Sequence, residues 1–116
     1  MKLQIKRVYE QPAREDGLRV LVDRLWPRGL AKQDADVDLW LKDIAPSTGL
    51  RRWFGHDPRK WTEFRHRYRA ELDANRMAVE TLRERGGSGT VTLLYAARDQ
   101  QHNQAVVLKD FLDKAE

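Results

Sequence analysis

The sequence predicts a single α/β domain, built on a mainly parallel sheet of three to five strands that helices flank. Residues 18–23 (LRVLVD) and 90–95 (TVTLLY) are short, apolar and rich in β-branched side chains, which is typical of buried central strands. Each is followed further along by helical patterning, and strands that alternate with helices favour a parallel sheet. A chain of 116 residues has room for one core, so one domain is expected.

The start of the chain predicts a further strand. Residues 3–9 alternate apolar and polar side chains, as a half-buried strand does. Residues 10–17 contain proline, aspartate and glycine and are expected to form a loop. This loop is short for a crossover between parallel strands. The first strand is therefore expected either to pair antiparallel or to lie apart from residues 18–23.

The segment before the longest helix predicts short elements. Residues 32–38 are polar and irregular, and residues 38–43 alternate again, which fits an edge strand or a helical turn. Ser47 or Thr48 is expected to cap a short helix, because a hydroxyl oxygen accepts from free N–H groups in the first turn. Gly55 is expected to end that helix.

A long helix is predicted over residues 58–85, with Asp57 as its cap and Pro58 at its first position. Gly86 and Gly87 end it, and Asn75 interrupts its apolar stripe, where a bend or break is expected. The apolar side chains at helical spacing are expected to share one buried face: Trp61, Phe64, Tyr68, Leu72, Val79 and Leu82.

A final helix is predicted over residues 100–114, with Asp99 as its N-terminal cap. Its apolar side chains recur at helical spacing, which indicates one face turned toward the core. The side chains expected to point inward are Ala105, Val106, Leu108, Phe111 and Leu112.

The formal net charge is +4 and the sequence pI is near 9.6, with positive charge concentrated in residues 1–30 and 59–86. A basic chain favours polyanionic partners. No run of five like charges is present, so a basic nucleic-acid tail is not supported. Four arginines form a second stripe on the long helix, which either borders a groove or is neutralised by acidic neighbours: Arg65, Arg69, Arg76 and Arg83.

Several function classes find no support in the sequence. There is no cysteine, which excludes disulfides, thiol nucleophiles and cysteine-based zinc sites. The three histidines have no metal-ligand spacing such as HExxH, and no nucleotide-binding glycine fingerprint is present, so no metal or cofactor is predicted. No signal peptide or stretch long enough to span a membrane is visible, and a soluble, cytoplasmic protein without a membrane partner is expected.

Polar side chains follow both predicted central strands, in residues 23–29 (DRLWPRG) and 97–103 (ARDQQHN). The carboxyl ends of neighbouring parallel strands meet at one edge of a sheet, where ligands bind in open α/β folds. The candidates for proton transfer are Asp23 and His102. The candidates for holding an anion are Arg24, Arg28, Arg98 and Asn103. The candidates for a pocket wall or cap are Trp26, Asp99 and His56.

Two aspartates compensate two of the three arginines in this set, which leaves one positive charge for a phosphate or carboxylate. The structural alternative is a closed ion pair between Arg98 and Asp23. Two other classes stay open, namely a nucleic-acid-binding module that uses the basic long helix and an interaction protein without chemistry. The oligomeric state is not predicted.

Five segments carry a resemblance to a known family: LVDRLWPRGL (21–30), LWLKDIAPS (39–47), LRRWFGHDP (50–58), FRHRYRAEL (64–72) and LLYAARDQQHNQAVVL (93–108). They closely resemble the YeaO-like proteins of the domain of unknown function 488 family. The resemblance covers nearly the whole chain, and it implies an α/β fold and a cytoplasmic, mostly bacterial protein. Longer relatives carry a cysteine near this last segment, and thiol chemistry does not transfer because this chain has none.

Overall fold

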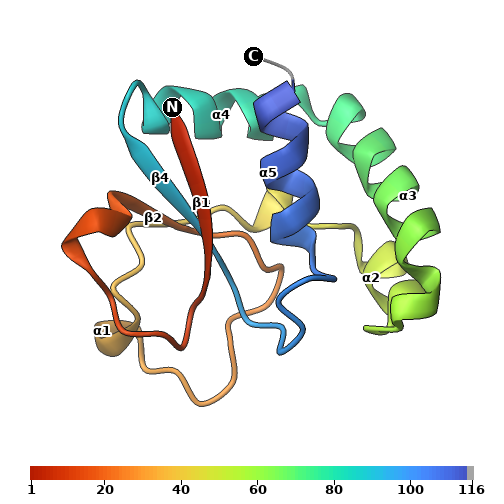
Figure 1. Cartoon of the computed structure of the whole chain (residues 1–116), viewed down its shortest axis with the longest axis horizontal. Helices are drawn as coiled ribbons and strands as arrows, with labels where there is room; N and C mark the ends of the chain where they lie inside the picture. The colour runs from red at the N-terminus through yellow and green to blue at the C-terminus, as the bar shows by residue number, and fades with distance from the viewer. Residues whose placement is uncertain (115–116) are drawn as a thin grey trace.

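The computed structural model describes residues 1–114 and contains one sheet of four strands, all parallel (Figure 1). Their order across the sheet is β1 (Lys2–Arg7), β4 (Thr90–Tyr95), β2 (Leu18–Leu21) and β3 (Leu39–Trp40). The predicted α/β class and the parallel, central pairing of β2 with β4 are confirmed. Strand β1 pairs parallel to β4 and is not adjacent to β2, so the second alternative for the first strand holds.

Helices cover one face of the sheet. The helices are α1 (Lys32–Ala35), α2 (Thr48–Phe54), α3 (Trp61–Ala74), α4 (Arg76–Gly86) and α5 (Gln104–Lys114), with 3-10 turns η1 (Arg14–Asp16), η2 (Lys42–Ile44) and η3 (Pro58–Lys60). Figure 1 shows α2 to α5 grouped on one side and the single-turn α1 apart from them. Residues 32–38 are thus partly helical, and residues 38–43 form both an edge strand and the start of a 3-10 turn.

The main core lies between the sheet and α2 to α5. Alternate side chains of the central strands point into it, such as Val20 on β2 and Leu93 on β4. They meet the apolar faces of the helices, including the fully buried Leu108 of α5. The predicted helical stripe is buried at Phe64, Tyr68, Leu72, Val79 and Leu82, whereas Trp61 is only half-buried.

The opposite face of the sheet is covered by connecting segments instead of helices. The crossover from β1 to β2 passes over β4, where the Thr92 hydroxyl donates to the Asp16 carbonyl at 2.6 Å. Gly17 makes this close passage feasible. Its φ is +63°, and a Cβ at this position would lie 2.2 Å from the Thr90 carbonyl oxygen. The close passage of this crossover over β4 explains how the parallel strands β1 and β2 can be joined by so few residues.

The predicted long helix is broken at Asn75, which lies between α3 and α4. The Asn75 side-chain amide donates to the Asp43 carbonyl at 2.7 Å, outside both helices. Its backbone has φ −112° and ψ 57°, which is not helical. The break expected from the sequence is confirmed, and it turns one long rod into two helices that wrap the core.

Two details of the last helix differ from the sequence prediction. Helix α5 begins at Gln104, and its cap is Asn103, whose Oδ1 accepts from the Val106 backbone N–H. Asp99 instead closes the preceding turn by accepting from the N–H groups of residues 101 and 102. The side chains that face the core also differ from the prediction, because Val107 is buried whereas Val106 and Phe111 are only half-buried. None of the helices within residues 1–114 is long and apolar enough to cross a membrane.

Candidate functional site

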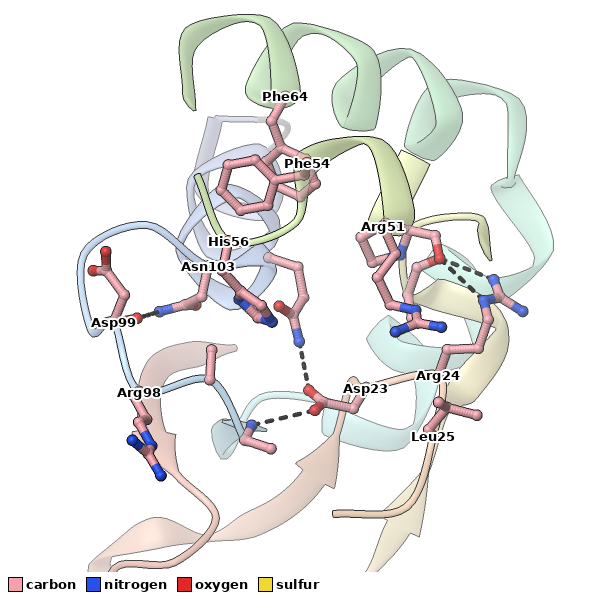
Figure 2. A pocket seen from close by; sticks show the side chains of 15 residues that line it. Asp23, Arg24, Leu25, Arg51, Phe54, His56, Phe64, Arg98, Asp99 and Asn103 are labelled. Atoms are coloured by element: carbon pink, nitrogen blue, oxygen red, sulfur yellow. Dashed lines mark hydrogen bonds between the residues drawn. The ribbon is translucent and has the colours of Figure 1, made fainter. Parts of the chain in front are cut away.

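A cavity of about 550 Å³ lies at the carboxyl ends of β2 and β4 (Figure 2). The connection after β2 packs on the loop-covered face of the sheet, and α5 after β4 packs on the helical face. Neighbouring strands whose connections leave to opposite faces open a crevice, the place where α/β sheets bind ligands. Its lining is Asp23, Arg24, Leu25, Ala45, Pro46, Arg51, Phe54, His56, Phe64, Ala96, Ala97, Arg98, Asp99, Asn103 and Gln104.

Asp23 lies in the wall of the cavity, two residues beyond the end of β2. Its carboxylate accepts from the Ala96 backbone N–H at 3.3 Å and from the Gln104 side-chain amide at 2.5 Å. The Trp40 indole donates to the Asp23 carbonyl, which fixes the backbone here. Burial raises the pKa of Asp23 to about 6, because the two neutral donors and the more distant charge of Arg51 compensate it only in part.

Two arginines approach the cavity from different elements. The Arg24 guanidinium donates to the carbonyls of Pro46 and Ala45 at 3.0 and 3.1 Å, and so ties the exit of β2 to the segment before α2. The Arg51 guanidinium, on α2, donates to no group within the described residues 1–114. Figure 2 shows the Arg51 guanidinium turned toward the side of the cavity that holds Asp23.

The segment after β4 forms another wall. Arg98 is exposed, and Figure 2 shows its guanidinium extending away from Asp23. The predicted alternative of a closed pair between Arg98 and Asp23 is not what the structure shows. Hydrogen bonds from the Gln101 backbone and from His102 lower the pKa of Asp99. Asn103 is buried and donates to the Asp99 carbonyl, which holds this turn closed.

Aromatic rings from α2 and α3 close the upper wall. Phe54 and Phe64 stack with centroids 4.2 Å apart, and both rings belong to the main core. His56 follows Gly55, and both residues have left-handed backbones, with φ of 58° and 52°. This sharp turn brings His56 over the cavity beside Phe54. A non-glycine residue at such a φ is strained, and strained residues cluster at binding sites.

Three of the predicted site residues are not part of the cavity lining. Arg28 is exposed, and its carbonyl accepts from the Tyr9 hydroxyl. Trp26 packs edge-on against Trp40 in the small core on the loop-covered face. His102 is bound through Nδ1 to Asp99 at 2.9 Å and lies against the Trp61 ring. The six other candidates, Asp23, Arg24, Arg98, Asn103, Asp99 and His56, do line the cavity.

Sequence reasoning missed Arg51 and Gln104. Arg51 and Phe54 are three residues apart in the predicted short helix, so they share one face, and this spacing was a usable signal. Gln104 was placed inside a helix that in fact begins with it, because the cap was assigned to Asp99. Within the part of the chain that the structure covers, no group of three or more histidine, aspartate and glutamate side chains could hold a metal ion.

Comparison with known proteins gives relatives along the whole chain. The chain is 43% identical over 112 residues to "Uncharacterized protein YeaO" of Escherichia coli K12, which spans 97% of both chains. It is 42% identical over 112 residues to "Uncharacterized protein Rv3073c" of Mycobacterium tuberculosis H37Rv and "Uncharacterized protein Mb3100c" of Mycobacterium bovis. These alignments cover 97% of this chain and 94% of each relative. No solved structure matches the chain.

A family model with the description "Inactive DUF488-N3 subclade" matches residues 2–116. This match and the full-length relatives confirm the resemblance that the sequence segments indicated. The chain therefore belongs to the DUF488-N3i family, the inactive DUF488-N3 subclade.

Proposed function

We propose that the chain binds a small organic anion, carrying a phosphate or carboxylate group, in the cavity at the carboxyl ends of β2 and β4. One observation carries this proposal. The Arg51 guanidinium faces the cavity and has neither a hydrogen-bond nor an ion-pair partner among residues 1–114. A guanidinium presents a planar set of donors that matches a carboxylate or a phosphate. An anionic ligand would supply the partner that the protein does not.

The surroundings of Arg51 support an anion. Arg24 and Arg98 add two positive charges to the lining, and Asp23 and Asp99 add two negative ones. Helix α5 also begins at the cavity, with Asn103 and Gln104 in its lining. The N-terminus of a helix carries a partial positive charge and favours negative groups. The cavity is therefore a more favourable place for a singly charged anion than for a cation.

The proposed role is binding without catalysis. Asp23 and His102 are the two residues that the sequence offers for proton transfer, and only Asp23 lines the cavity. His102 is engaged by Asp99 and packed on Trp61 instead. The matching family is also described as inactive, which supports a ligand-binding role over a reaction.

The basic face of α3 and α4 gives weaker support for nucleic acid as a partner. The break at Asn75 divides the predicted arginine stripe between two helices. Arg69 is paired with Asp110 of α5, so its charge is compensated within the protein. A continuous basic stripe is therefore not available for a phosphate backbone, and nucleic-acid binding becomes an alternative outcome of the test below.

The test is calorimetric titration of the chain with inorganic phosphate, benzoate and phenyl phosphate. We expect Arg51→Met to weaken binding at least about tenfold, because a charge-assisted hydrogen bond is worth roughly 1.5–3 kcal/mol. Arg98→Met should weaken it less, about threefold, because an exposed charge at the rim is screened by solvent. The matched control is Arg52→Met, which removes the same charge from the next residue of α2, outside the cavity lining.

An equal loss of affinity in the Arg51 and Arg52 variants would contradict a specific anion site. Arg28→Met gives a second control, since Arg28 lies outside the lining. Oligonucleotide binding that falls steeply with salt and does not depend on Arg51 would favour the nucleic-acid alternative. The absence of binding to every probe would favour an interaction protein without a ligand.

A further inference from the structure

The Asp23 carboxylate has acceptor capacity that the protein does not use. An ionised carboxylate offers about four acceptor positions. Within residues 1–114, only two donors reach it, the backbone N–H of Ala96 and the side-chain amide of Gln104, and both are neutral. No lysine, arginine or histidine among the described residues forms an ion pair with Asp23. A largely buried carboxylate with no cation partner is costly unless a partner arrives.

Arg51 presents the complementary situation in the same cavity. Its charge acts on Asp23 through space, but the two side chains form no ion pair. Within residues 1–114, the Arg51 guanidinium and the Asp23 carboxylate therefore face one cavity without an ion pair between them. Arg98 also lacks an ion pair there, but it is exposed and its guanidinium extends away from Asp23. A simple anion on Arg51 would leave Asp23 unsatisfied and would be repelled by it. A ligand with opposite charges at two places would satisfy both side chains.

Seven of the thirteen other lining residues are apolar, and the cavity is larger than one charged group requires. Side chains without charge surround the space, among them Leu25, Pro46, Phe54, Phe64 and Ala97. The volume of about 550 Å³ lies within the range typical of pockets for organic ligands, roughly 300–1,000 Å³. The stacked rings of Phe54 and Phe64 offer a wall for a flat or aliphatic body. A bare phosphate would leave most of this apolar surface uncovered.

We propose that the ligand of this cavity is an amine-bearing organic anion with an apolar body, its ammonium group bound by Asp23 and its phosphate- or carboxylate-type group by Arg51. This inference rests on the proposed function and adds the amine and the apolar body to it. The apolar body would lie along Phe54 and Phe64. An ammonium group carries three donors, and the two acceptor positions of Asp23 that Ala96 and Gln104 leave free can take two of them without displacing Gln104.

The test uses two matched series of probes, titrated calorimetrically into the full chain at pH 7.5. The first series is L-phenylalanine, 3-phenylpropanoate, which lacks the amine, and 2-phenylethylamine, which lacks the carboxylate. The second is 1-amino-2-phenylethylphosphonate and 2-phenylethylphosphonate. We expect the amine-bearing anion to bind at least about tenfold more tightly than its amine-free counterpart in one series, as expected for one charge-assisted pair. 2-Phenylethylamine alone should bind more weakly than L-phenylalanine.

Two substitutions assign the charges to residues. Asp23→Asn should remove the preference for the amine and leave the affinity for the amine-free anion unchanged or higher. Arg51→Met should weaken both anions of a series. Asp34→Asn, in the exposed helix α1, is the matched control for Asp23→Asn and should change neither affinity. The comparison of probes on the unmodified chain stands even where a variant fails to fold.

Equal or tighter binding of the amine-free anion in both series would overturn this inference and leave the proposed function in place. A preference for the amine that survives Asp23→Asn would also overturn it, since the ammonium would then be bound elsewhere. If no anion of either series binds and the probes of the proposed function fail too, both proposals are wrong. If 2-phenylethylamine binds as tightly as L-phenylalanine, Arg51 has no part in the site and the inference fails.

Discussion

Asp16 and Asp23 lie two residues before and two residues after strand β2, and their surroundings are opposite. Asp16 contacts two cations, Lys6 at 3.2 Å and Arg19 at 2.5 Å, and accepts from the Ala13 backbone N–H. Asp23 has only neutral donors. Burial raises the pKa of both carboxyl groups. At Asp16 the hydrogen bonds from Ala13, Lys6 and Arg19 outweigh it and the pKa is lowered, whereas at Asp23 the pKa rises to about 6.

The difference separates a structural clasp from a site that can accept a ligand. At the amino end of β2, Asp16 completes a closed network in which Arg19 also donates to the carbonyls of Asp36 and Ala35. Both side chains are buried, with Asp16 5% and Arg19 2% exposed. At the carboxyl end, the carboxylate of Asp23 borders a cavity and lacks a charged partner. The same residue type at two ends of one strand therefore serves stability at one end and, we propose, binding at the other.

The largest effect is expected from Asp16→Ala. It leaves the side chain of Arg19, only 3% exposed, without its carboxylate partner, and breaking a buried pair from one side costs about 3–5 kcal/mol. Urea denaturation measures this loss of unfolding free energy. Asp34→Ala, in exposed α1, is the control and should change stability by less than about 0.5 kcal/mol. A loss below about 1 kcal/mol for Asp16→Ala would show that the ion pairs of Asp16 contribute little to the stability of the fold.

A loss of comparable size is expected from Phe64→Ala, for a different reason. Phe64 is 2% exposed and stacks on Phe54, so truncation removes buried apolar surface and leaves a void, which costs about 3–5 kcal/mol. Thermal and urea unfolding measure it. The result sharpens the comparison, because the pocket end of the molecule would then derive its stability from aromatic packing instead of ion pairs. Unchanged melting behaviour would mean that this wall is not part of the core.

Asp23→Asn is expected to stabilise the protein at pH 8, the opposite sign to Asp16→Ala. The folded-state pKa of Asp23 is about 6 and lies above its unfolded-state pKa, so the folded chain keeps a proton on Asp23 that the unfolded chain has already lost. The protein therefore loses stability as the pH rises from the unfolded-state pKa through 6. A shift of about two units corresponds to roughly 2–3 kcal/mol at pH 8, which the neutral amide removes. Urea denaturation at pH 8 and pH 4 measures the gain, which should vanish at pH 4.

If Asp23→Asn stabilises the protein as much at pH 4 as at pH 8, the gain in stability does not come from the charge of Asp23. Asp16 provides the internal reference, because its pKa is lower in the folded chain than in the unfolded chain. The ionised carboxylate of Asp16 therefore stabilises the protein at a pH above the unfolded-state pKa, and this stabilisation is lost as the pH falls through the folded-state pKa. The two aspartates should therefore shift the pH profile of stability in opposite directions. Profiles that shift in the same direction would break the comparison.

The smallest effect is expected from His56→Gly. His56 has a φ of +58°, which costs a residue with a Cβ about 1 kcal/mol and costs glycine nothing. The variant should be more stable by about that amount in urea, while it loses the imidazole over the cavity. Ala70→Gly, in the exposed interior of α3, is a contrasting control that should destabilise by about 0.8–1 kcal/mol. A loss of stability at position 56 would mean that the contact with Phe54 outweighs the strain.

The strands and helices followed from local sequence patterns wherever one physical rule acted alone. The β-branched runs of β2 and β4 predicted parallel central strands, and α2 is capped by Ser47, one of the two caps that the sequence offered. The cap of α5 was wrong because Asp99 and Asn103 both suit the position, and only packing selects between them. Sequence reasoning also named six residues of the cavity, because the carboxyl ends of parallel strands must meet.

The rest was decided by contacts between segments far apart in the chain. The sequence determined the fold class, the two central strands and the break at Asn75, since these depend on side-chain pattern and backbone preference over a few residues. Only the tertiary structure determined that β4 lies between β1 and β2 and that Arg51 of α2 faces Asp23. The tertiary structure also places Arg28 and His102 outside the cavity lining. The direction of a side chain after a turn depends on the layer of the fold against which the turn packs, and the burial of apolar surface between distant segments determines that packing.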